Sequence, residues 1–338
     1  MATSVVDNRL VFADLCRVLA CFGVILGHCC DGFVRNYANL PLSYWFYAHF
    51  LGSISCIAVP LFVLLSGSLE LKPQGSFKFQ DMKRRLIRIL VPLGVWSCVY
   101  LCFVAWREKV SPFGLNFNQP EMGHLWFIYM MAGLYLFLPI FKALFDGFSN
   151  QRKFIYYFCF IWLAITCIPI HYPVQIFGWI KQPYFLGCGG YFLIGAFIAH
   201  VVKDFGSSRV WTALYIISLS FTFFSVWYAS FKAHTTVHDN YSLFSLSTAI
   251  AAISTFVLLA RVRRVPKILA NLLAFISDKA FIIYFLHGFV LSFLHPIIIG
   301  NRTSIILLLP CWILATFVTC LGCGTILRYF PRSKLLFG

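Results

Sequence analysis

The first apolar stretch of the chain contains three ionisable side chains, and a fourth directly follows it, at a spacing that suits proton transfer. Arg17 and His28 are eleven residues apart. In an α-helix, eleven steps end about 20° past three full turns and about 16 Å along the axis, so both side chains share one face. Asp14 precedes Arg17 by three residues and can pair with it. Asp31 follows His28 by three residues and can orient the imidazole or hold its proton.

The rest of the chain is strongly apolar, which makes these residues unusual. Of its 338 residues, 60% are hydrophobic and 11% are charged, whereas about a quarter of the residues in soluble domains are charged. This composition excludes a soluble enzyme, a disordered regulator and a disulfide-stapled secreted domain. Charges at membrane depth are costly, so they are functional candidates. The alternative is a structural Asp14–Arg17 ion pair with His28 at the membrane interface.

The elements that must position these residues are apolar segments long enough to cross a bilayer. A membrane-spanning helix uses about 20 residues, and lipid requires its backbone groups to be satisfied internally. We therefore predict an all-α polytopic membrane protein with about ten transmembrane helices and a single domain over residues 1–338. The ten stretches are 11–30, 45–69, 89–106, 123–141, 154–170, 183–202, 210–230, 242–260, 279–299 and 303–327. Residues 267–276 are predicted to form a cytoplasmic interfacial helix, with the ninth span starting near Lys279.

The basic residues predict the orientation of the chain. With the N-terminus placed in the cytoplasm, nineteen lysines and arginines lie in inner segments and six in outer loops. This positive-inside bias predicts that both termini are cytoplasmic. Because the net charge of +16 comes from residues between apolar runs, it indicates topology and contact with the lipid bilayer rather than nucleic-acid binding. The thirteen cysteines are scattered and fit buried thiols, and the histidines lack the partners for a metal site.

A second group of candidates lies at the predicted cytoplasmic side. Ser66 and Gly67 end the second span, near the expected depth of Arg17. Arg84 and Arg88 enter the third span four residues apart and so share a helix face. Guanidinium groups match phosphate oxygens, which favours a phosphorylated ligand, whereas simple anchoring at the membrane surface is the alternative.

Candidates also occur at the outer surface and near mid-membrane. His124 and Trp126 open the fourth span, where Trp126 could equally be an interfacial residue. His287 lies in the ninth span, about 12 Å beyond Lys279 at helical rise. Glycines between 189 and 195 can allow close packing of helices.

Together these segments resemble the integral-membrane acyltransferase family 3. Asp14-x-x-Arg17, followed by ten residues and His28, is similar to its opening helix. The segments VPLFVLLSG, KRRLIRILVP, HLWF, GGYFLIG and the stretch from Ser277 to His287 resemble later motifs in the same order. The resemblance covers most of the chain and is greatest to short bacterial members that O-acylate surface polysaccharides.

The resemblance implies transfer of an acyl group, most often acetyl from cytoplasmic acetyl-CoA, to a sugar hydroxyl of an envelope or exported glycan. It also implies a multi-pass protein of the bacterial inner membrane. Arg17 and His28 fall on the family's arginine–histidine motif. Ser66 with Gly67 falls on its serine–glycine motif, and the basic motif falls on Arg84, Arg85 and Arg88. This chain departs from the pattern at Val18, where glycine is common, and at Ser68 and Leu69, where an aromatic residue is common.

The resulting hypothesis assigns a role to each residue. His28 acts as general base, with Arg17 and Asp14 as further catalytic residues, and an acyl-histidine intermediate is the alternative to direct transfer. Acyl-CoA, a donor substrate rather than a bound cofactor, is held by Arg17, Ser66, Arg84, Arg85 and Arg88. The glycan or lipid-linked oligosaccharide acceptor is held by His124, Trp126 and His287. Ser66 or His124 can stabilise an oxyanion if packing brings either residue close, and a polysaccharide synthesis complex is a further partner.

Two other classes of function fit parts of the pattern. A transporter or flippase for a lipid-linked sugar or small anion would also use many spans, an internal arginine and basic inner loops. The absence of an obvious internal repeat weakens that alternative. A non-catalytic scaffold leaves the alignment of Asp14, Arg17 and His28 unexplained.

Overall fold

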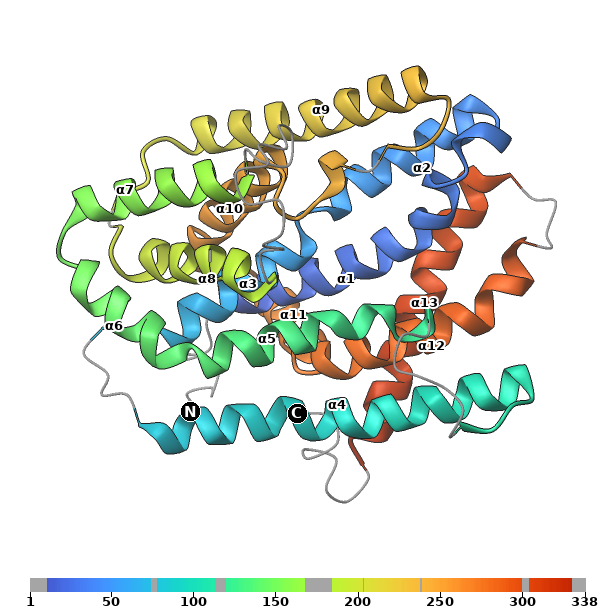
Figure 1. The fold of residues 1–338 in the computed structure, drawn as a ribbon, viewed down its shortest axis with the longest axis horizontal. Coiled ribbons are helices and arrows are strands. Elements are labelled where there is room, and N and C mark those ends of the chain that lie inside the picture. Colours follow the sequence, from blue (N-terminus) through green and yellow to red (C-terminus); the bar gives the residue numbers. More distant parts are fainter. Residues whose placement is uncertain are drawn as a thin grey trace.

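A computed structural model describes residues 11–73, 78–112, 120–167, 184–202, 204–237, 239–299 and 304–329 of the chain. Within these ranges all regular structure is helical, as Figure 1 shows. The α-helices are α1 (Val11–Val34), α2 (Leu42–Ser55), α3 (Ala58–Glu70), α4 (Phe79–Glu108), α5 (Trp126–Leu136), α6 (Leu138–Phe148), α7 (Arg152–Trp162), α8 (Tyr184–His200), α9 (Ser208–Ala233), α10 (Leu246–Ala260), α11 (Lys267–Ser277), α12 (Ala280–Ile299) and α13 (Ile305–Leu327). Short helical turns are η2 (Tyr37–Asn39), η4 (Pro120–Leu125), η5 (Leu163–Cys167) and η7 (Asp239–Tyr241).

The lengths and compositions of these helices support a multi-pass membrane protein. Five helical segments are long and apolar enough to cross a membrane, and two bent pairs raise the number to seven. Three shorter apolar helices cover Lys153–Cys167, Gly187–His200 and Leu246–Ala260. The all-helical membrane architecture is therefore confirmed for the described residues. The count of ten spans and the cytoplasmic placement of both termini stay predictions.

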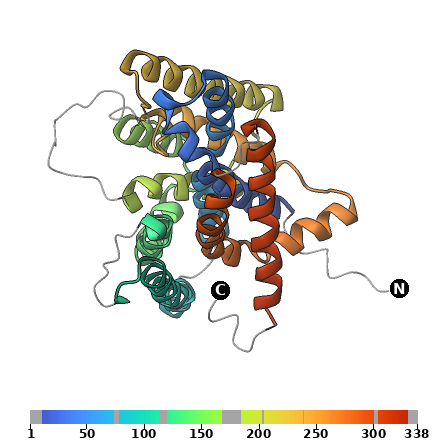
Figure 2. The same ribbon diagram turned by 90° about the vertical axis from the view of Figure 1, so that its right-hand side faces the viewer.

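Helix α1 lies in the centre of the molecule. In Figure 1 it runs through the middle, with α9 along one edge and α4 along the opposite edge. The end-on view of Figure 2 again places α9 and α4 at the periphery. Helix α1 packs against α2, α3, α11, α12 and α13. A central position explains how one helix can expose its ionisable face to several neighbours at once.

Glycine allows α3 and α8 to pack with their backbones in close contact. A Cβ atom at Gly67 would lie 1.7 Å from the carbonyl oxygen of Phe192, and one at Gly195 would lie 1.9 Å from that of Leu64. Small residues allow such approach in membrane helices because packing rather than water exclusion drives their association. The expectation that glycines of the sixth span permit close packing is confirmed at Gly195.

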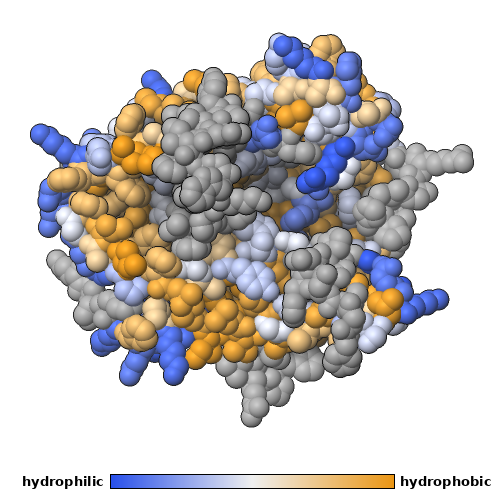
Figure 3. Space-filling model, viewed as in Figure 1, coloured by the Kyte–Doolittle hydropathy of each residue, from blue (hydrophilic) through white to orange (hydrophobic). Residues whose placement is uncertain are grey.

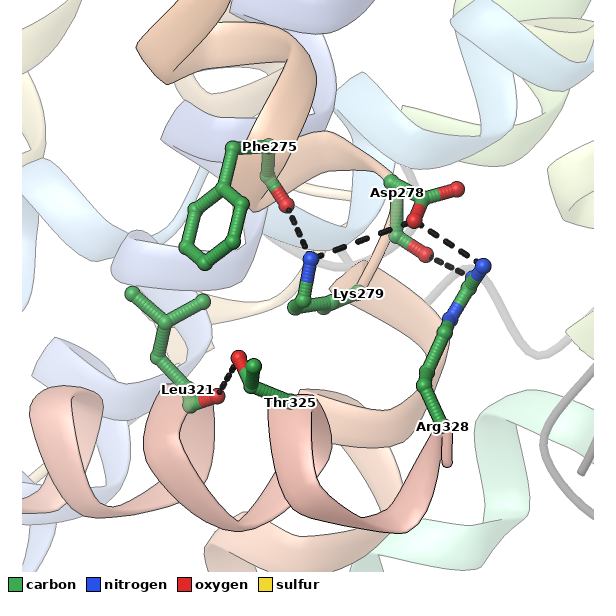
Figure 4. A network of polar contacts seen from close by, with 6 residues as sticks. All are labelled: Phe275, Asp278, Lys279, Leu321, Thr325 and Arg328. Atoms are coloured by element: carbon green, nitrogen blue, oxygen red, sulfur yellow. Dashed lines mark hydrogen bonds and ion pairs between the residues drawn. The ribbon is translucent and has the colours of Figure 1, made fainter. Parts of the chain in front are cut away.

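Two helix pairs are sharply bent. The segment Gly123–Leu136 meets α6 at 60°, next to Pro139, and α11 meets the described part of α12 at 62°. The second bend confirms the predicted break before the ninth span at Lys279. Its two sides are fixed by a polar network (Figure 4).

This network joins α11, α12 and the end of α13. The Lys279 ammonium donates to the Phe275 carbonyl oxygen at 3.1 Å and lies 3.6 Å from the centre of the Phe275 ring. Arg328 forms an ion pair with Asp278 at 2.9 Å and also donates to its backbone carbonyl oxygen. The bend is therefore held from both sides, so Ser277 occupies a fixed position.

The surface is predominantly apolar between its ends. Figure 3 shows broad hydrophobic areas across this face, with hydrophilic side chains mostly toward its left and right ends. Exposed aromatic and aliphatic side chains on α9 include Ile217, Phe221 and Phe224, each more than half exposed. Such a surface suits lipid contact rather than water.

Two boundaries differ from the sequence prediction. Helix α4 begins at Phe79, ten residues before the predicted start of the third span at 89, because hydropathy detects only the apolar part of a helix. The arginines of the basic motif thus lie on the helix itself. The second span, predicted as 45–69, consists of two helices that meet at Cys56 and Ile57.

Candidate active site

Arg17 and His28 each contact one helix of the bent pair α11 and α12. Arg17 lies 3.4 Å from the Asp14 carboxylate and donates to the Ser277 hydroxyl at 3.3 Å, at the α11–α12 bend. The His28 ring lies 5.2 Å from the ring of His287 on α12, centre to centre. Ser277 and His287 are ten residues apart in the chain, and they lie along α1 in the same order as Arg17 and His28. The contacts of Arg17 and His28 thus confirm that their side chains share one face of α1.

Three histidines gather at the His28 end of α1, and we call them the histidine cluster. The rings of His124 and His287 lie 4.7 Å apart, and those of His28 and His287 lie 5.2 Å apart. His287 is 1% exposed and His124 is 8% exposed, whereas His28 is exposed. The arrangement gives one imidazole access to a substrate and places two buried imidazoles behind it.

Hydrogen bonding fixes the tautomer of His287. Its Nδ1 donates to the carbonyl oxygen of Tyr284, which can only accept. In a neutral imidazole this leaves Nε2 as an acceptor, and Nε2 is buried with no hydrogen-bond partner among the described residues. Such a lone pair beside His28 can accept a proton or a hydrogen bond.

Aromatic side chains hold His124 against this cluster. The Tyr284 hydroxyl donates to the His124 backbone carbonyl oxygen. The Tyr100 hydroxyl donates to the Phe285 carbonyl oxygen at 2.8 Å, and its ring lies 5.1 Å from that of His124. Gly288 makes room, because a Cβ there would lie 2.8 Å from both His124 Cε1 and the Tyr100 hydroxyl. Sequence patterns gave no sign of Tyr100 or Gly288, which only tertiary packing brings here, and they included Tyr284 only as part of the stretch from Ser277 to His287.

Charged residues form a second cluster near the Arg17 end of α1. Arg85 pairs with Glu70 at 2.5 Å, which joins α4 to the end of α3. Lys72 and Arg88 lie within electrostatic reach of Glu70. Glu70, Arg85, Arg88 and Arg17 all lie within electrostatic reach of Tyr135, a half-buried residue of α5. We call Arg17, Lys72, Arg85 and Arg88 the cationic cluster.

The other predicted donor-site residues lie at the margin of this cluster. Arg84 pairs with Asp81 at 2.6 Å, and its side chain is 75% exposed. Arg88 is exposed and has no ion-pair partner among the residues that the structure describes. The Ser66 hydroxyl donates back to the Phe62 carbonyl oxygen at 2.8 Å.

Ser66 lies too far from His28 to assist there. Helices α1 and α3 run antiparallel. A Cβ at Gly23 of α1 would lie 2.9 Å from the Ala58 Cβ of α3, so these two residues lie at the same height along the helix axes. From that level, His28 lies about 7 Å toward one end and Ser66 about 12 Å toward the other. Of the two predicted oxyanion donors, His124 packs against His287, which in turn packs against His28.

Trp126 lines a cavity of about 670 Å³ close to the histidine cluster. The other walls come from α1, α2 and the segment around η7, and include Asp31 and Arg35. Within the described residues, no three His, Cys, Asp or Glu side chains are arranged to hold a metal ion.

The comparison with known protein families gives one match. The family described as "Acyltransferase domain" matches residues 10–328. A "Probable poly-beta-1,6-N-acetyl-D-glucosamine export protein" from Staphylococcus aureus strain Mu50 is 23% identical, over 95% of this chain and 94% of its own. Its counterpart from strain MSSA476 is 22% identical with the same coverage. No solved structure matches the chain. Since the family match extends from α1 to α13, the chain belongs to the integral-membrane acyltransferase family 3 and is a membrane acyltransferase.

Proposed function

We propose that the protein transfers an acetyl group from cytoplasmic acetyl-CoA to a sugar hydroxyl of an exported glycan in a bacterial inner membrane. The observation that carries this proposal is the division of α1 into two ends. The cationic cluster surrounds Arg17 at one end, and the histidine cluster surrounds His28 about 16 Å away. An anionic donor and a hydroxyl acceptor can thus bind at opposite ends of one helix face.

The cationic cluster suits the phosphate groups of coenzyme A. Arg88 is exposed and supplies a guanidinium fork, and Arg85 is oriented by Glu70. The pantetheine arm then extends along α1 past Arg17 toward His28. The Arg17–Ser277 hydrogen bond places a polar group beside this route.

At the histidine cluster the chemistry is acyl transfer by general base catalysis. His28 removes the proton of the sugar hydroxyl as the oxygen attacks the thioester carbonyl carbon. A carbon–oxygen bond forms and the carbon–sulfur bond breaks, so the products are the sugar ester and coenzyme A. The proton held by His28 passes to the departing thiolate. His287 Nε2 can accept a hydrogen bond from His28 and so hold its ring for attack.

Replacing His287 with phenylalanine tests this supporting role. The ring shape is kept, but the Nε2 acceptor is lost, so we expect kcat to fall about tenfold or more. The KM values for acetyl-CoA and glycan should change little. Steady-state kinetics in liposomes measures both effects, and a raised glycan KM with normal kcat would instead assign His287 to acceptor binding.

Arg88 provides a direct test of the donor site. Arg88→Ala removes one exposed guanidinium without leaving a buried partner, so folding should be preserved. Loss of one charge-assisted hydrogen bond to phosphate predicts about a tenfold rise in KM for acetyl-CoA. Arg264→Ala, an exposed arginine on the predicted same side, is the matched control. Equal KM values for both variants would remove Arg88 from the donor site.

The reaction itself is tested with purified protein in liposomes. The donor is acetyl-labelled acetyl-CoA and the acceptor probe is a β-1,6-linked N-acetyl-D-glucosamine oligosaccharide, chosen because the relatives' name contains that glycan. We expect label in the oligosaccharide and free coenzyme A in equal amounts. Folded protein that labels neither this probe nor a mixed lipid-linked glycan extract would contradict the proposal.

A second candidate function is export of the glycan, which the name of the curated relatives favours. Export predicts movement of unmodified oligosaccharide across the liposome membrane without acetyl-CoA. Acyl transfer predicts labelled product whose formation depends on His28. The same liposomes measure both outcomes.

A further inference from the structure

The cavity beside the histidine cluster is built from elements far apart in the sequence. Its volume of about 670 Å³ falls within the range of about 300–1,000 Å³ that is usual for small-molecule sites. Trp126 lines one side, Asp31 and Arg35 line another, and Tyr241 and Ser242 close it. Gly52 of α2 also borders the cavity, where a Cβ would lie 3.5 Å from the Tyr241 hydroxyl.

Helical geometry relates the α1 wall of this cavity to His28. Arg35 follows His28 by seven residues, so their side chains point in directions only about 20° apart around the helix axis. Asp31 lies between these two residues in the sequence, and its side chain is rotated about 60° from that of His28, in the same direction as Arg35. His28 itself does not line the cavity, whose wall on this side consists of Gly27, Cys30, Asp31, Val34 and Arg35. That wall is centred about 90° from His28 around the helix axis, and Asp31, on the side of the wall nearer to His28, lies within electrostatic reach of its imidazole.

The lining combines one aromatic face with several hydroxyl-binding groups. Trp126 offers an indole, whose apolar body suits the C–H face of a sugar ring. Asp31 and Arg35 form an ion pair at 2.7 Å, with 46% and 62% of their side chains exposed. That hydrogen bond raises the pKa of Arg35, so its guanidinium stays charged at neutral pH. A carboxylate accepts from sugar hydroxyls, and a guanidinium donates to them.

The wall formed by η7 is held rigidly in place. The Tyr241 hydroxyl bonds to the His49 ring, which is buried between Trp45 and Phe223. The Ser242 hydroxyl oxygen accepts from the Phe244 amide at 3.2 Å, so its own hydrogen can be donated to a ligand. This wall of the cavity is therefore preformed.

We propose that this cavity binds one neutral sugar residue of the acceptor, stacked on Trp126 and hydrogen-bonded to Asp31, Arg35 and Ser242, with its reactive hydroxyl directed to His28. This inference rests on the proposed function and identifies its acceptor subsite. No residue of the cationic cluster lines the cavity. Changes there should affect acceptor binding and leave donor binding unchanged.

Trp126→Ala is the first variant, and Trp106→Ala, which removes a 70% exposed tryptophan of α4, is its control. With the oligosaccharide probe, Trp126→Ala should raise the acceptor KM at least tenfold while the KM for acetyl-CoA stays unchanged. Trp126→Phe should restore most of the loss, because it keeps an aromatic face. Ser242→Leu, which fills the cavity from the opposite wall, should raise the acceptor KM even if Trp126→Ala fails to fold.

Binding is also measured without chemistry. The oligosaccharide alone should raise the Tm of wild type and Trp106→Ala, and should not raise that of Trp126→Ala or Ser242→Leu. Equal shifts in all four proteins, or no shift in wild type, would overturn the assignment of the cavity. A Trp126-dependent shift without any acyl transfer would support the cavity and contradict the proposed function. Acyl transfer with an unchanged acceptor KM in both Trp126→Ala and Ser242→Leu would support the proposed function and contradict the assignment of the cavity.

Discussion

Replacing His28 with alanine is expected to lower kcat for acyl transfer by about 10²- to 10⁴-fold, the usual contribution of a positioned general base. His28 is the exposed member of the histidine cluster, and His287 is too deeply buried to replace it. The cationic cluster is unaffected, so the KM for acetyl-CoA should change little. Rates of labelled glycan formation in liposomes, at saturating donor and acceptor, measure the effect.

His234→Asn is the matched control for this experiment, because the backbone of His234 is left-handed (φ 52°), a conformation that asparagine tolerates better than alanine. His234 is exposed, follows α9 and lies outside the histidine cluster, so its removal should leave the rate unchanged. Both variants should show the same helical content and Tm as wild type. Full activity in a folded His28→Ala protein would mean that another group removes the proton.

Gly67→Val should have the largest effect on stability. The first atom of any side chain at this position would lie 1.7 Å from the Phe192 carbonyl oxygen, which is backbone and cannot rotate away. Helices α3 and α8 would have to separate. Their close contact also depends on Gly195, where a Cβ would lie 1.9 Å from the Leu64 carbonyl oxygen. We expect a loss of at least about 3 kcal/mol, typical of severe overpacking. Thermal unfolding in detergent and the yield of monodisperse protein measure it.

Gly147→Ala is the control, because a Cβ at Gly147 has no neighbour within 4 Å. It should leave stability unchanged or raise it by up to about 1 kcal/mol, the difference in helix propensity. The comparison separates two explanations of the serine–glycine motif. A Gly67→Ala protein with normal Tm but no activity would show that this glycine acts on the substrate rather than on packing.

The sequence predicts best what depends on a single helix. The shared face of Arg17 and His28 follows from helical period alone, and the structure shows both side chains on one pair of partner helices. The break at Lys279 was also predictable, because Ser277, Asp278 and Lys279 interrupt an apolar run. Local composition is sufficient for features of this kind.

What the sequence could not predict depends on contacts between distant segments. His124 and His287 are 163 residues apart in the chain, and no pattern along it indicates that their rings lie 4.7 Å apart. The cavity likewise needs Trp126 and Ser242 together. Ser66 was expected near the depth of Arg17. The contact between Gly23 of α1 and Ala58 of α3 places Ser66 toward the Arg17 end of α1 and away from His28.

Helix α1 is uninterrupted from Val11 to Val34, and its partner helices contact it near both ends. Because a helix does not stretch, the separation of about 16 Å between Arg17 and His28 is constant. On the proposed donor route, this constant length makes the helix a molecular ruler for the donor. We expect an acetyl thioester on a shorter arm to stop before the imidazole even though its carbonyl is equally reactive, so that donors are selected by length rather than by leaving group.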